Sequence, residues 1–237
     1  MNDLGHLDLT GAALAQFFVL SFMIWAGANI SGANYNGAVT IALMITRHLS
    51  VLKGFLYLLA QFSGSLLAGL ILGCFLKMYT KDPLVFKNHT GYPHCDLERF
   101  GIGTCILAEL TATFFLVFMV YATAVPMYKV DPKKALAARY DAPKNNTFAL
   151  TIGGALGMAV LSIGPITGAA LNPWRVIGPA IITRELFWGE YWYGFVYYIF
   201  CPLAGVLAGL AAYLVFMRDE GQFDEENNND QEDDQVG

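Results

Sequence analysis

The chain has 237 residues, of which 56% are hydrophobic and 14% are charged, and its formal net charge is −5. Because the charges lie mostly between long apolar runs, this composition excludes a large soluble domain and indicates an all-α protein that crosses a membrane several times. No nucleophile, base and metal ligands cluster in the sequence, so we expect neither an enzyme nor a cofactor, a metal site or a nucleic-acid partner.

Five apolar runs are near or above the ~18–20 residues that a helix needs to cross hydrocarbon. In chain order they are Gly11–Ala28, Leu52–Leu76, Cys105–Val125, Phe148–Ile166 and Trp192–Phe216. Two further apolar segments, Val39–Leu49 and Val176–Leu186, are about half as long. We therefore predict five full spans and two re-entrant half-helices, which enter the membrane without crossing it.

An asparagine motif precedes each half-helix: Asn36-Gly37-Ala38 and, 136 residues later, Asn172-Pro173-Trp174. Asparagine is a good N-cap, and proline suits the first helical position. If the two half-helices meet at their N-termini, their positive ends and the two asparagine amides face the same point of a pore. A water there would accept a hydrogen bond from each asparagine, and so could not pass a proton to the next water. The pair predicts a channel for neutral solutes, whereas either motif alone could be an ordinary Asn turn.

With their flanking residues, Ile30–Thr40 and Thr167–Pro179, these motifs resemble the signature of the aquaporin, or major intrinsic protein, family. The stretches Val120–Val125 and Asp131–Lys134 most resemble the tonoplast intrinsic proteins. The resemblance covers nearly the whole chain and implies an inverted-repeat bundle in lipid, passive conduction of water and a homotetramer with one pore per subunit. The alternative is a non-conducting aquaporin-like protein with a structural or junctional role.

The resemblance also places a four-residue selectivity filter at Gln16, Val160, Ala169 and Arg175. Arg175 would donate hydrogen bonds to the solute and repel cations, and an arginine snorkelling to the interface is its alternative. Gln16 could instead make a buried interhelical hydrogen bond. Because no filter residue is aromatic, ammonia, hydrogen peroxide, urea or glycerol are expected to pass alongside water.

Several other residues receive an expected role. His94 matches the place of a loop histidine that extends the filter in the tonoplast group, with a solvated loop histidine as the alternative. Glu109 is expected to orient the backbone of the second asparagine loop rather than relay protons. Asn88 begins a glycosylation sequon. The four cysteines show neither disulfide nor metal spacing and are predicted to be small apolar fillers: Cys74, Cys95, Cys105 and Cys201.

A channel domain over residues 1–218 is expected to precede a disordered acidic tail, residues 219–237, which holds nine acids and no base. If the predicted spans are threaded through the membrane, eight basic residues lie on one side and five on the other. The side with more basic residues is expected to be cytoplasmic, and the tail lies on that side. The vacuolar, contractile-vacuole and plasma membranes all stay open as locations.

The chain departs from the aquaporin pattern in two ways. Gly37 stands where proline is usual and Trp174 where alanine is usual, and we hypothesise that the indole fills the volume of the missing proline ring. A Trp174 turned into the surrounding helices is the alternative. The first half also has no counterpart of the glutamate-bearing span Cys105–Val125. This incomplete repeat predicts a native protein with roughly 20–30 more residues and another apolar span.

Overall fold

The computed structural model describes residues 9–79, 93, 95, 97–125, 147–182 and 196–216. All regular structure within these ranges is helical. In chain order the elements are α1 (Leu9–Ser31), α2 (Gly37–Ile45), α3 (Val51–Tyr79), α5 (Leu97–Ala124), α7 (Thr147–Thr167), α8 (Pro173–Ile182), the π-helix η2 (Val196–Phe200) and α9 (Cys201–Phe216).

Four of these helices, α1, α3, α5 and α7, are long and apolar enough to cross a membrane. The fifth predicted span, Trp192–Phe216, is described only from Val196 onward, and the change from π-helix to α-helix at Cys201 leaves α9 with 16 residues. By contrast, α2 and α8 have 9 and 10 residues. Their lengths match the two predicted half-helices.

Two boundaries of the described helices differ from the prediction by at least four residues, apart from the start of α9 given above and the end of α8, where the description stops at Ile182. α2 ends at Ile45 rather than Leu49, because Arg47 adopts a left-handed φ of 63° and donates its N–H to the carbonyl of Met44. Such bonds satisfy the last carbonyls of a helix. α5 begins at Leu97, before the predicted Cys105, and includes a kink. A short helical turn with two charged residues, Glu98 and Arg99, therefore precedes the predicted span.

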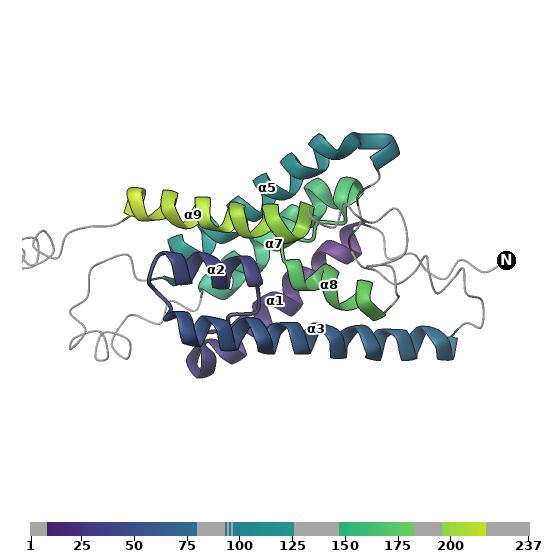
Figure 1. The fold of residues 1–237 in the computed structure, drawn as a ribbon, viewed down its shortest axis with the longest axis horizontal. Helices are drawn as coiled ribbons and strands as arrows, with labels where there is room; N and C mark the ends of the chain where they lie inside the picture. The colour runs from purple at the N-terminus through teal and green to yellow at the C-terminus, as the bar shows by residue number, and fades with distance from the viewer. Residues whose placement is uncertain are drawn as a thin grey trace, which may run out of the picture.

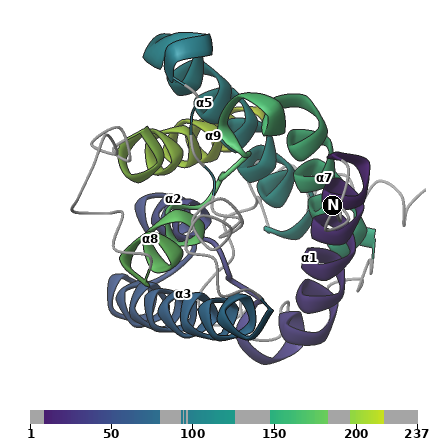
Figure 2. The same ribbon diagram turned by 90° about the vertical axis from the view of Figure 1, so that its right-hand side faces the viewer.

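The two short helices lie between α3 and α9 in both views of the molecule (Figures 1 and 2). α2 packs on α9, and α8 packs on α3. α1 runs along α7, while α5 contacts both α7 and α9. In each half of the chain, the short helix packs on a long helix of the other half: α2 on α9, and α8 on α3. An inverted repeat is expected to pack in this way.

The position of α5 has no described counterpart in the first half. No helix of the described ranges lies against both α1 and α3 in the way that α5 lies against α7 and α9. The outer faces of α1 and α3 are therefore apolar and exposed. Among their exposed large side chains are Phe18, Phe22, Trp25, Phe55, Leu56, Leu59, Leu67 and Phe75.

Glycines allow each short helix to approach its long neighbour. A Cβ on Gly178 of α8 would lie 2.4 Å from the carbonyl oxygen of Ser65 in α3. In the other half, a Cβ on Gly205 of α9 would lie 2.7 Å from the carbonyl oxygen of Ala38 in α2. Backbone atoms cannot move away as a flexible side chain can, so both contacts require glycine.

Gly178→Ala is expected to destabilise the protein by about 2 kcal/mol, because the added methyl group overpacks the α3–α8 contact. Thermal unfolding in detergent measures this effect. Gly64→Ala in α3 is the control, since its Cβ would meet no described atom within 4 Å. Equal melting temperatures for the two variants would contradict the close packing of α8 on α3.

Candidate functional site

The two asparagine loops begin with the same backbone conformation and differ at Leu171, whose φ of 52° has no counterpart at Tyr35. Gly32 and Gly168 have φ values of 79° and 74°, and the alanine after each has a φ of 50° and 49°, respectively. In both loops this alanine donates its N–H to a hydroxyl two residues earlier, Ser31 Oγ at 3.3 Å or Thr167 Oγ1 at 3.2 Å. The internal repeat in the sequence is thus also a repeat of local structure.

Each asparagine caps the short helix that follows it. Asn36 Oδ1 accepts from the N–H of Ala38 at 2.8 Å, at the start of α2. Asn172 Oδ1 accepts from the N–H of Trp174 at 3.2 Å, at the start of α8. A side-chain acceptor at this position satisfies a backbone donor that has no partner within its own helix.

The side-chain amides also connect the two loops to each other. Asn36 Nδ2 donates to the carbonyl of Leu171 at 3.0 Å, and Asn172 Nδ2 donates to that of Tyr35 at 3.1 Å. The N–H of Gly37 donates to Asn172 Oδ1 at 3.2 Å, a bond that a proline could not make. The N-termini of α2 and α8 therefore meet, and each amide keeps a second N–H beyond its loop contact.

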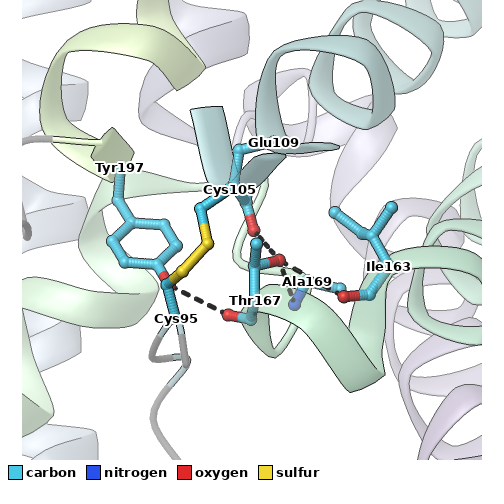
Figure 3. Close-up of a disulfide and its surroundings, with 7 residues drawn as sticks. All are labelled: Cys95, Cys105, Glu109, Ile163, Thr167, Ala169 and Tyr197. Atoms are coloured by element: carbon cyan, nitrogen blue, oxygen red, sulfur yellow. Dashed lines mark hydrogen bonds between the residues drawn. A yellow bond between two sulfur atoms is a disulfide. The ribbon is translucent and has the colours of Figure 1, made fainter. Parts of the chain in front are cut away.

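Glu109 of α5 holds the second loop. Its carboxylate is fully buried and accepts from the N–H groups of Ala170 and Leu171, both at 2.9 Å. It also accepts from the hydroxyl of Thr167 at 2.5 Å (Figure 3). The thiol of Cys201 donates to Oε2 as well, at 3.5 Å, and four donors on one carboxylate favour a positioning role over proton relay.

The first loop has no matching carboxylate among the described residues. Asn34 takes the place that Ala170 takes in the second loop, and its buried Nδ2 has no hydrogen-bond partner within the described part of the chain. Instead, α3 supplies polar contacts: Tyr57 donates its hydroxyl to the carbonyl of Ser31 at 2.6 Å. The two halves are thus held by different chemistry.

The four residues assigned to the filter are only partly brought together. Arg175 donates to the carbonyl oxygen of Ala169. Val160, 3% exposed, and Ala169, fully buried, belong to one apolar cluster that joins α1, α5 and α7. Gln16 is half-buried and makes no hydrogen bond to any described residue. His94 and Asn88 lie outside the described residues, as does the tail, residues 219–237.

The prediction that all four cysteines are unpaired fillers is wrong for two of them. Cys95 and Cys105 form a disulfide beside the Glu109 network, with their Cα atoms 6.2 Å apart (Figure 3). Sequence spacing did not indicate the bond, because ten residues of straight helix would separate the two cysteines by about 15 Å. The non-helical Gly101 inside α5, with φ 72° and ψ 156°, allows them to approach. Of the others, neither is in a disulfide: Cys74 is exposed, while Cys201 is buried and donates its thiol to Glu109 Oε2 at 3.5 Å, so it is more than an apolar filler.

The disulfide predicts two reactive and two protected cysteines. After denaturation without reductant, a maleimide is expected to add twice, at Cys74 and Cys201, and four times after reduction, because only a free thiol reacts. Intact mass measures the number of labels. Cys95→Ala should then give three labels with or without reductant, and four labels on unreduced wild-type protein would contradict the bond.

Sequence reasoning missed Gln61. Its Nε2 donates to the carbonyl of Asn34 at 2.7 Å and to Thr40 Oγ1 at 2.9 Å, and its Oε1 accepts from Trp174 Nε1 at 3.0 Å. Gln61 therefore contacts both asparagine motifs from α3. The available signal was a glutamine inside an apolar run, the same signal that singled out Gln16.

The comparisons with known proteins agree with this geometry. The family model for the major intrinsic proteins matches residues 2–214. Aquaporin TIP4-4 of Zea mays is 35% identical over 91% of this chain and 75% of its own length. A probable TIP-type aquaporin of Medicago truncatula is 33% identical over 88% of this chain and 72% of its own length.

Among solved structures, the aquaglyceroporin of Plasmodium falciparum has a similar fold. It aligns with a TM-score of 0.67 over 89% of this chain and 83% of its own, at 18% sequence identity. The matching family and the aquaporin relatives define a membrane channel rather than an enzyme. The chain belongs to the major intrinsic protein family, and its curated relatives are aquaporins of the tonoplast intrinsic type.

Proposed function

We propose that this chain is a passive channel that conducts water and small neutral solutes and excludes protons and ions. The observation that carries the proposal is the paired asparagine geometry: each amide caps its own short helix and also bonds the opposite loop. In this proposal α2 and α8 are re-entrant half-helices, and the last apolar run completes a fifth span.

The two asparagines would impose one orientation on a passing water. Asn36 and Asn172 each use one amide N–H on the opposite loop, which leaves one N–H each for the solute. A water that accepts from both must point its own hydrogens away, so it cannot pass a proton along a chain of waters. The positive ends of α2 and α8 add a barrier to cations.

Arg175, Val160, Ala169 and Gln16 are proposed to form the filter. Arg175 supplies a permanent charge and hydrogen-bond donors, and its contact with the Ala169 carbonyl fixes one end of the guanidinium. Without an aromatic side chain in this set, ammonia, hydrogen peroxide, urea and glycerol are proposed solutes alongside water. A homotetramer in the tonoplast is the assembly and location that the relatives suggest.

Swelling of proteoliposomes in an osmotic gradient tests this function. We expect water flow at least tenfold above that of empty liposomes, roughly the effect of lowering a barrier by 1.4 kcal/mol or more. The same assay with gradients of urea, glycerol and ammonia then ranks these solutes by their permeability. Swelling no faster than that of empty liposomes, with correctly folded protein in the membrane, would favour the non-conducting, junctional alternative.

A further inference from the structure

The two asparagine motifs differ where they touch. The internal repeat aligns Gly37 with Pro173 and Ala38 with Trp174. The two residues that follow the asparagine are therefore small in the first motif and large in the second. A Cβ on Gly37 would lie 2.6 Å from Trp174 Nε1 and 3.0 Å from Pro173 Cγ. The indole therefore occupies the space beside Gly37, as hypothesised from the sequence, and it also turns toward α3.

Two side chains of α3 also contact the indole. Trp174 Nε1 donates to Gln61 Oε1 at 3.0 Å, and its ring lies 5.5 Å from that of Phe62, centroid to centroid. Gln61 in turn donates to the carbonyl of Asn34 and to Thr40 Oγ1. Through Gln61, the side chain of Trp174 in α8 is thus linked to the first asparagine loop and to α2.

We propose that Trp174 is a positioning residue that sets the spacing of the two asparagines, through its contact with Gly37 and its hydrogen bond to Gln61. The backbone N–H of Gly37 donates to Asn172 Oδ1, so any shift of Gly37 away from the indole disturbs the amide of Asn172. The proposal rests on the channel function proposed above. It adds that Gly37 and Trp174 act as one coupled pair.

A double-mutant cycle of Gly37→Ala and Trp174→Ala tests the pair. We expect Gly37→Ala alone to lower water permeability about tenfold, because its methyl group displaces the indole. In the Trp174→Ala background, the same change is expected to lower it less than about twofold, since the obstructing ring is gone. Gly64→Ala, with open space around its Cβ, is the matched control and should leave permeability unchanged.

Proton leak, measured with a pH-sensitive dye in the same liposomes, separates positioning from simple stability. Trp174→Ala should raise the ratio of proton to water permeability, because the Asn172 amide is no longer held in one orientation. Trp174→Phe keeps a ring beside Gly37 but loses the bond to Gln61, so its ratio should lie between those of wild type and Trp174→Ala. An unchanged ratio in both variants would overturn the proposal.

Melting temperatures of the four cycle members in detergent give a readout that does not need conduction. Non-additive melting temperatures would support the coupled pair even if wild-type protein conducted nothing, in which case the proposed function alone would fail. Additive effects on melting and on permeability, in protein that does conduct water, would overturn the coupling and leave the channel function standing. Size-exclusion profiles identify any variant that does not fold.

Discussion

Glu109→Ala is expected to abolish water conduction and most of the folded protein. The change removes the acceptor for the N–H groups of Ala170 and Leu171 and for the hydroxyl of Thr167. Buried donors without a partner each cost roughly 1–3 kcal/mol, so a loss of about 3 kcal/mol or more is expected. Thermal unfolding in detergent and liposome swelling measure the two effects.

Glu109→Gln separates charge from volume. The amide keeps the size of the side chain but offers one acceptor oxygen, and its NH2 group would face donors of the loop. We expect this variant to fold with a lowered melting temperature and to conduct less water than wild type. Wild-type conduction by Glu109→Ala would show that the second loop does not depend on this carboxylate.

Arg175→Ala is expected to change selectivity while water flow continues. The variant loses a fixed positive charge and the donor to the Ala169 carbonyl, and it gains space at that point. We expect urea or glycerol permeability to rise about tenfold, which corresponds to about 1.4 kcal/mol, within the range of one hydrogen bond to a charged group. Water permeability should stay within about twofold of wild type, since Asn36 and Asn172 keep their helix caps and their bonds to the opposite loops.

Solute-gradient swelling and ion-leak measurements on the same liposomes distinguish the roles of Arg175. Arg175→Lys keeps the charge but loses the planar fork, so cation exclusion should persist while solute permeability rises. Unchanged solute permeability in both variants would remove Arg175 from the filter and favour an arginine that only anchors the helix at the interface.

Much of the fold followed from local rules. Long apolar runs predicted α1, α3 and α7 within about three residues of their observed ends, and also the end of α5, because hydrocarbon thickness sets the length of a span. The repeated asparagine motifs predicted both short helices and their caps, because a capping side chain acts on the backbone two residues away. The buried acid Glu109 was also recognisable, since a carboxylate in an apolar run needs donors.

What the tertiary structure decided are contacts that no local pattern predicts. The Cys95–Cys105 bond depends on the non-helical Gly101 inside α5, and the bond from Trp174 to Gln61 depends on how α8 packs on α3. Local sequence carries no information on such distances, because periodicity and caps act within one or two helical turns. The sequence alone thus determined the class of protein and its two asparagine loops, while packing decided which side chains hold those loops together.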